Sequence, residues 1–268
     1  MPLTIAHPAA VIPLARYMKK YGIFSALIIG SLMPDFSYFL FLPITREQTH
    51  SLAGMFWFCL PVGLLVYVVF HGLMKRPLLS LMPMQLAMRV APYTKDNEIV
   101  SHGIKLLKIC ISILVGTSTH LLWDSFTHEG GFMVEALPFL NNILFRMFGY
   151  KVYAFKILQH GSTIIGVSLL LLWFFQWYQK AEPGHESVRV HILPFNQRVF
   201  WISMILLVGV WVGLSNGHQF SRYEVGAAAI LREYARGLFI NGSSTVGGLL
   251  LIYSVTYQAL KIQTQKAV

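Results

Sequence analysis

The sequence predicts an all-α, polytopic membrane protein with about five full spans and an N-terminal helical hairpin. Hydrophobic residues make up 55% of the 268 residues and charged residues only 12%, about half the roughly 25% that is usual in a soluble domain. Several runs without Asp, Glu, Lys or Arg approach or exceed the roughly 20 residues that cross a bilayer. No comparable stretch alternates apolar and polar residues as a strand would. The composition therefore excludes a soluble globular domain and a disordered chain.

The expected spans follow from these uncharged runs. Four of them are long enough to cross a bilayer, namely residues 52–70, 161–179, 199–217 and 237–260. A fifth run, residues 109–123, is shorter but extends backwards through residues 104–108. Lipid offers no hydrogen-bond partner to the unpaired backbone groups at the edge of a strand. We therefore expect every span to be a helix, which pairs these groups internally.

The N-terminal region predicts a short helical hairpin, with arms at residues 8–20 and 23–34. Tyr21-Gly22 is a plausible turn between the arms. Each arm would reach only about 18–20 Å at 1.5 Å per residue, which is short of the roughly 30 Å hydrocarbon core. With the basic tip of the hairpin at the cytoplasm, His7 and Asp35 are expected together at the opposite face.

The formal net charge of +10 fits excess Lys and Arg in cytoplasmic loops, so no nucleic-acid partner is expected. Three segments are predicted to be cytoplasmic, and their basic residues are Lys75, Arg76, Arg89, Lys95, Lys180, Arg189, Arg198, Lys261 and Lys266. No hydrophilic linker of useful length interrupts the chain. We therefore expect a single integral membrane domain over residues 1–268, with a metal-site bundle in 1–180 and additional scaffold spans in 181–268.

Histidine and aspartate side chains gather in short segments near the predicted non-cytoplasmic face. The chain has only three aspartates, and two of them, Asp35 and Asp124, lie in or beside apolar runs, where ionised groups are costly and usually functional. The candidate metal ligands are His7, Asp35, His50, His120, Asp124, His128 and His160.

The spacing of His120, Asp124 and His128 is the most informative local pattern. Residues at i, i+4 and i+8 lie above one another on one helix face. This arrangement suits two metal ions bridged by the central carboxylate, and imidazole with carboxylate is a ligand set that zinc accepts. A helix–helix hydrogen bond, a proton relay or a structural ion pair would give the same local pattern. Arg46, near His50, could meet a phosphate, but an exposed loop arginine is the expected role.

Several motifs resemble those of the bacterial membrane-protein family called domain of unknown function 4184. They are M-P-L-T-I-A-H-P-A-A-V-I-P-L at the N-terminus, then G-S-L-M-P-D-F-S-Y-F, T-H-S-L-A-G and T-H-L-L-W-D-S-F-T-H. The resemblance covers nearly the whole chain and implies a multi-pass protein of the inner (plasma) membrane. The family is also similar to the YdjM-type membrane-bound metal-dependent hydrolases and, more distantly, to the zinc-dependent phospholipases C.

The phospholipase resemblance implies roles for individual residues. Asp35, His50, His120 and Asp124 resemble one zinc site, with Asp124 as the bridging carboxylate. His7 resembles the early histidine of a second site, and His128 and His160 resemble the histidines of a third. The phospholipase glutamate four residues after the last histidine is Ile164 here, so one or two ions are expected rather than three.

Three functions remain open from the sequence. The favoured one is a membrane-embedded, metal-dependent hydrolase of a phosphoester, lipid-derived or a small molecule, in which Asp35 also acts as general base. The second is a non-enzymatic membrane protein with a structural or sensory metal site. The third is a proton-coupled transporter that uses the buried carboxylates and imidazoles as a relay. Membrane lipids are the expected partners, and the oligomeric state is not predicted.

Overall fold

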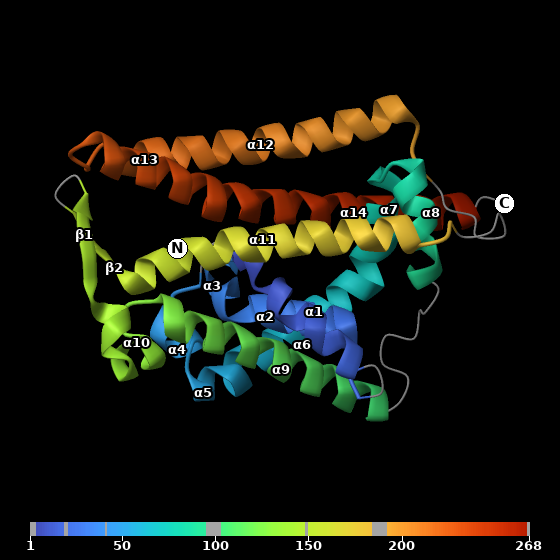
Figure 1. Cartoon of the computed structure of the whole chain (residues 1–268). Helices are drawn as coiled ribbons and strands as arrows, with labels where there is room; N and C mark the ends of the chain where they lie inside the picture. The colour runs from blue at the N-terminus through green and yellow to red at the C-terminus, as the bar shows by residue number, and fades with distance from the viewer. Residues whose placement is uncertain are drawn as a thin grey trace. The chain divides into compact units, whose positions relative to one another are not determined.

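The computed structural model describes residues 4–18, 21–40, 42–94, 103–147, 150–183 and 192–266. Helices form nearly all of its regular structure (Figure 1). Five helical segments in these residues are long and apolar enough to cross a membrane: Leu52–Leu81, Gly103–Thr127, Ala154–Lys180, Phe195–Ser221 and Ala227–Leu260. These segments contain the predicted spans and confirm an all-α, multi-pass membrane protein. Lys95 and Arg189, which were used to predict the orientation, lie outside the described residues.

The chain divides into two compact units. Unit 1 comprises Met1–Ser37, Pro43–Tyr67 and Val100–Lys180. Unit 2 comprises Tyr38–Leu42, Val68–Ile99 and Ala181–Val268. Every candidate metal ligand belongs to unit 1. The expectation of a single integral domain stays a prediction.

Unit 1 begins with the helical hairpin that the sequence predicts. Helix α1 (Pro8–Tyr17) begins at a proline, which suits the first helical position because the missing N–H would have no partner there. Helix α2 (Phe24–Leu32) starts after Ile23, whose backbone N–H donates to Ser112 Oγ at 2.8 Å. Both helices are too short to cross a bilayer.

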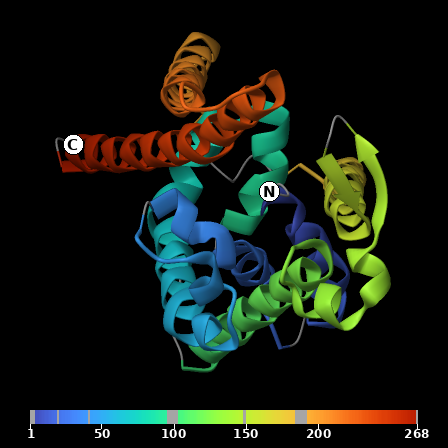
Figure 2. The same ribbon diagram turned by 90° about the vertical axis from the view of Figure 1, so that its left-hand side faces the viewer.

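The central contact of unit 1 is between α2 and α9 (Gly103–Thr127), which lie side by side in Figures 1 and 2. Gly30 and Gly116 face each other's helices, and a Cβ on either would lie 2.2 Å from a backbone oxygen of the partner helix. Thr117 Oγ1 donates to the carbonyl of Gly30 at 3.1 Å. The two backbones therefore pack in direct contact, which brings α2 within reach of the polar end of α9.

A broken helical segment leads into the first full span. Helices α3 (Phe36–Leu40), α4 (Arg46–Thr49) and α5 (Leu52–Gly54) are short, and α6 (Leu60–Val69) and α7 (Lys75–Leu81) complete the span. Two π-helical stretches, Met55–Cys59 and Phe70–Met74, interrupt it. The apolar core of unit 1 is formed by Ala26, Ile29, Met33, Phe58, Cys59, Tyr67, Ile109 and Ile113.

A short β-hairpin follows α9 and α10 (Phe132–Ala136), and the sequence did not predict it. Strands β1 (Ile143–Met147) and β2 (Tyr150–Tyr153) pair antiparallel, with Phe145 opposite Val152 and a bulge between Ile143 and Phe145. Strands of four or five residues are too short to give a clear alternation pattern. The hairpin leads directly into α11 (Ala154–Lys180), which packs against α1 and α9.

Unit 2 contains α8 (Met84–Val90), α12 (Phe195–Ser221), α13 (Ala227–Arg236) and α14 (Ser243–Lys266). Helix α12 runs beside α13 and α14 (Figure 1). Glycines allow this close packing, since a Cβ on Gly213 would lie 2.8 Å from Leu238 Cα.

Candidate metal centre

The polar side chains of the centre lie either at a helix boundary or on the buried face of α9. His7 immediately precedes Pro8, so its side chain stands at the start of α1. Pro34 ends α2 in a 3-10 turn, Met33–Asp35, which leaves the buried Asp35 just before α3. His50 lies between α4 and α5, which are capped by Thr45 and Ser51. These breaks bring side chains from three segments toward α9.

Helix α9 supplies the other side of the centre. Its buried residues recur every three or four positions: Ile109, Ser112, Ile113, Gly116, Thr117, His120, Asp124 and Thr127. This spacing defines one helix face. The stripe changes from apolar to polar toward the C-terminal end, so His120 and Asp124 project from the same face that packs on α2.

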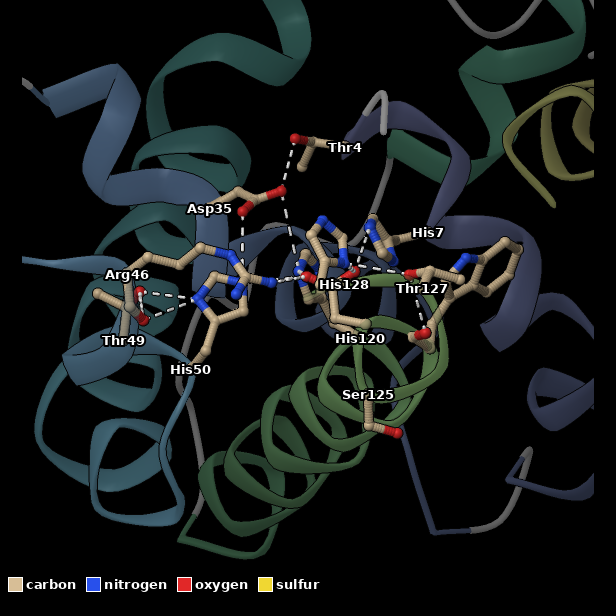
Figure 3. A network of polar contacts seen from close by, with 12 residues as sticks. Thr4, His7, Asp35, Arg46, Thr49, His50, His120, Ser125, Thr127 and His128 are labelled. Carbon is tan, nitrogen blue, oxygen red and sulfur yellow. Dashed lines mark hydrogen bonds and ion pairs between the residues drawn. The ribbon is translucent and has the colours of Figure 1, made fainter. Parts of the chain in front are cut away.

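Five of the seven predicted ligands converge in the centre: His7, Asp35, His50, His120 and Asp124. Figure 3 shows the polar contacts around them. Two overlapping groups have ligand atoms within 4.8 Å of one another and could hold a metal ion: His7, Asp35 and His120, and His50, His120 and Asp124. The close-up shows Asp35 beside the histidine side chains of the centre.

The distances around the centre are those expected between ligands of one ion. His50 Nε2 lies 3.4 Å from Asp35 Oδ1 and 3.3 Å from Asp124 Oδ2. His120 Nε2 lies 3.8 Å from Asp35 Oδ2 and 3.5 Å from Asp124 Oδ2. Tetrahedral zinc with ligands at about 2.0–2.1 Å requires ligand atoms about 3.3–3.4 Å apart. His50, His120 and Asp124 therefore form one three-residue group whose spacing suits an ion of this size, and Asp35 joins His120 in the other group.

Several buried polar atoms of the centre have no hydrogen-bond partner. They are His7 Nδ1, His50 Nε2, His120 Nε2 and Asp124 Oδ1. Leaving a buried donor or acceptor unpaired costs about 1–3 kcal/mol for each group. Four such atoms around one small volume are unusual in a folded protein, and a bound cation would coordinate several of them at once.

Hydrogen bonds from the other ring nitrogen hold two of the imidazoles in the ligand orientation. His120 Nδ1 lies 2.8 Å from the carbonyl oxygen of Ser31, and His50 Nδ1 lies 3.1 Å from the carbonyl oxygen of Arg46. A carbonyl can only accept, so in His120 the proton belongs on Nδ1 and the lone pair on Nε2. His50 Nδ1 also lies 3.0 Å from Thr49 Oγ1, a hydroxyl that can donate or accept. Metal-ligating histidines usually donate a hydrogen bond from the ring nitrogen that does not bind the metal.

Because Ser31 occupies Nδ1 of His120, only Nε2 of that ring is free for an ion. The two overlapping ligand groups share this residue, so an ion bound through His120 Nε2 can belong to only one of them at a time. His7 stacks on His120 with ring centroids 3.7 Å apart and an interplanar angle of 18°. His7 Nε2 also lies 3.7 Å from Asp124 Oδ1, the carboxylate oxygen directed away from His50.

Burial and the nearby carboxylates shift the pKa values of His7 and His50 in opposite directions. Burial lowers the pKa of His7 to about 3, and the neighbouring His120 adds to the lowering. His7 is therefore neutral at pH 7, which is the form that binds metals. Burial also opposes charge on His50, but the carboxylates of Asp124 and Asp35 outweigh it and raise the pKa of His50. These carboxylates favour a positive charge in the position between them.

His128 lies beside the centre but in neither ligand group. Helix α9 ends at Thr127, so His128 follows the helix rather than continuing its face. Its Nδ1 lies 3.1 Å from Thr127 Oγ1 and 3.3 Å from Asp124 Oδ1. Burial lowers the pKa of His128 to about 4. The side chain therefore contacts the carboxylate from outside the ion position.

His160 is not brought to the centre. It is exposed on α11, while the preceding residue, Gln159, is buried and accepts a hydrogen bond from Lys156. Neither group of candidate ligands among the described residues includes His160.

Two further residues touch the ligands, and the sequence analysis did not assign either to the centre. Thr4 Oγ1 donates to Asp35 Oδ2 at 2.7 Å. Arg46 was expected to be an exposed loop residue, and this expectation is wrong: Arg46 begins α4, and its Nη2 lies 2.6 Å from Asp124 Oδ2. The carboxylate of Asp124 attracts the guanidinium toward the centre. Because the two residues are 78 positions apart in the sequence, no local spacing predicts the contact. The only sequence signal for a role of Thr4 in the centre is its position three residues before His7.

The family assignment rests on the whole sequence. The family described as Domain of unknown function (DUF4184) matches residues 1–255. Searches of the curated proteins and of the solved structures found no match. The geometry of the centre therefore carries the functional argument by itself, and the chain belongs to the DUF4184 family.

Proposed function

We propose that this protein is a membrane-embedded, metal-dependent hydrolase of a phosphoester. The observation that carries the proposal is the pair of buried imidazole nitrogens, His50 Nε2 and His120 Nε2, which have no hydrogen-bond partner and lie 3.3–3.8 Å from carboxylate oxygens of Asp35 and Asp124. Imidazole and carboxylate together are a ligand set of zinc. A divalent ion held there, one per chain in this geometry, would supply an activated water and polarise a phosphoryl oxygen.

The residues have distinct roles in this proposal. His50, His120 and Asp124 hold the ion, and His7 fills the side of Asp124 that faces away from His50. Asp35 is a ligand through one oxygen and a proton acceptor for the attacking water through the other. Thr4 fixes the carboxylate of Asp35 by its hydrogen bond to Oδ2, which keeps both oxygens in place.

The substrate is proposed to be lipid-derived because the centre belongs to a multi-pass membrane protein. We propose that the centre lies toward the non-cytoplasmic face of the inner membrane, because loops between other spans carry excess Lys and Arg, which is typical of cytoplasmic loops. A phosphate headgroup at that face would meet the polar end of α9.

A second candidate, a structural or sensory metal site, is favoured by the depth of the ligands. The side chains of His120, Asp124, His50 and Asp35 are only 0%, 6%, 7% and 9% exposed. Four protein ligands can close a tetrahedral site, whereas a catalytic ion keeps one position for water or substrate. The two candidates share the ion and differ in whether a small molecule can reach it.

The test is the metal content of the detergent-purified protein together with phosphoesterase activity. We expect close to one zinc per chain in the wild type, and a loss of most of it in His120→Ala and Asp124→Ala. His160→Ala is the matched control, because this histidine is exposed on α11 of the same unit, and it should keep the wild-type zinc content. Wild-type protein without bound metal after purification in zinc-containing buffer would contradict the proposal.

Activity separates the two candidates. The zinc-loaded wild type should hydrolyse a chromogenic phosphodiester or release a phosphorylated headgroup from phospholipid vesicles, and a chelator should abolish this. Zinc bound at one per chain without hydrolysis of either substrate would favour the structural or sensory site.

A further inference from the structure

Arg46 brings a permanent positive charge to the edge of the metal centre. Its Nη2 lies 2.6 Å from Asp124 Oδ2, and its side chain is 30% exposed, whereas that of Asp124 is 6% exposed. Figure 3 shows the Arg46 side chain extending toward the histidines of the centre. An arginine stays protonated at any physiological pH, so this charge is present whether or not an ion is bound.

The guanidinium has unused hydrogen-bonding capacity. It carries five N–H donors in a planar fork, and among the described residues Asp124 is the side chain with which it pairs. The exposed fraction rises from 0% at His120 to 15% at His128 and 30% at Arg46. Among these three side chains, that of Arg46 is therefore the one most exposed to solvent.

The backbone of Arg46 fixes this arrangement. Thr45 and Gln48 form a capping box at the start of α4. The carbonyl oxygen of Arg46 accepts hydrogen bonds from Thr49 Oγ1 at 3.2 Å and from His50 Nδ1 at 3.1 Å. One residue thus orients a candidate ligand through its main chain and places a cation beside the ion position through its side chain.

We infer that Arg46 binds the anionic oxygens of the substrate's phosphoryl group and so selects phosphoesters over neutral esters and amides. This inference rests on the proposed function. Arginine and a phosphoryl group match in geometry, since two parallel N–H groups meet two oxygens. A donor fixed before the reaction can also stabilise negative charge that develops on the phosphoryl oxygens. Arg46 is a specificity residue of the centre, and it acts by direct contact with the substrate.

The competing role is that Arg46 only neutralises Asp124 and supports the fold. In that case its removal would lower the zinc content or the stability of the protein. Any change in phosphate affinity would then be explained by the loss of zinc or of folded protein. Arg46→Gln removes the charge, and Arg46→Lys keeps the charge but loses the planar fork. Arg146→Gln is the control, because Arg146 is an exposed arginine on β1 of the same unit.

The experiment measures zinc content, and then the binding of inorganic phosphate to zinc-loaded protein by titration calorimetry. We expect the wild type and all three variants to hold the same zinc content. The dissociation constant for phosphate should rise at least 10-fold in Arg46→Gln, rise less in Arg46→Lys, and stay unchanged in Arg146→Gln. A parallel titration with short-chain phosphatidic acid distinguishes a lipid source from free phosphate. Weaker binding of either ligand in Arg46→Gln than in the wild type supports the inference.

Two results would overturn the inference while the proposed function stands: phosphate affinity in Arg46→Gln within twofold of wild type at full zinc content, or a loss of zinc in both Arg46 variants. A wild type that binds no zinc would instead remove the proposed function itself. If Arg46→Gln fails to fold, Arg46→Lys decides the matter, because unchanged phosphate affinity in that variant contradicts recognition by the fork.

Discussion

Thr4 contacts the candidate metal centre through its hydroxyl group. It donates to Asp35 Oδ2 at 2.7 Å, while Oδ1 of the same carboxylate faces His50 at 3.4 Å. Because Thr4 holds one oxygen, the carboxylate cannot turn away from the ion position without breaking this bond. Residues of this kind orient ligands, and their loss typically costs 10–100-fold in metal affinity.

We therefore expect Thr4→Val to weaken zinc binding about 10-fold, measured by competition with a chelator of known affinity. Thr4→Ser is the control, since it keeps the hydroxyl and should stay close to the wild type. Equal zinc affinity in Thr4→Val and the wild type would show that Asp35 needs no such support.

Two more residues show what the sequence could and could not predict about the centre. The i, i+4 spacing of His120 and Asp124 predicts a shared helix face, because helical geometry alone determines it. His160 and Gln159 are both polar neighbours on α11, and successive helical residues point about 100° apart, so only one faces inward. It is Gln159, and tertiary packing rather than sequence makes that choice. The Arg46–Asp124 pair joins segments 78 residues apart, which no local pattern reports.

At the scale of elements, the glycine contact between α2 and α9 positions the centre. Gly30 lets α2 approach the backbone of Ile113, and the next residue, Ser31, accepts the hydrogen bond of His120. A Cβ at position 30 would lie 2.2 Å from the oxygen of Ile113, so the helices must separate. Separation moves the Ser31 carbonyl away from His120 and frees the ring.

Gly30→Ala should therefore lower both thermal stability and zinc content. Overpacking of this kind costs about 1–3 kcal/mol, which corresponds to a fall in Tm of several degrees in detergent. Gly161→Ala is the control, because a Cβ there meets nothing within 4 Å. An unchanged Tm and zinc content in Gly30→Ala would contradict the close packing of α2 on α9.

Element boundaries were predictable to different degrees. The long spans were predicted because twenty or more uncharged residues leave a bilayer-spanning helix as the simplest arrangement. The same helices extend beyond the predicted runs, as Gly103–Thr127 shows, since charged side chains near a membrane boundary do not end a helix. The β1–β2 hairpin was missed because its register depends on pairing between two strands too short to show a period.

At the scale of the whole molecule, the distribution of basic residues predicts an orientation that puts the centre on the non-cytoplasmic side. An alkaline phosphatase reporter, which is active only outside the cytoplasm, should be active when fused after residue 130 and inactive when fused after residue 180. Residue 130 follows α9 and residue 180 ends α11. The reverse pattern would place the centre at the cytoplasmic face.

The ligand set itself can be observed by X-ray absorption at the zinc edge on detergent-purified, zinc-loaded protein. We predict nitrogen and oxygen neighbours at about 2.0–2.1 Å, the outer scattering of imidazole rings, and no sulfur. In Asp124→Ala this signal should be lost or rearranged. Sulfur neighbours at about 2.3 Å, which the free thiols of Cys59 and Cys110 could supply, or zinc surrounded only by water, would contradict a metal centre built from His50, His120, Asp35 and Asp124.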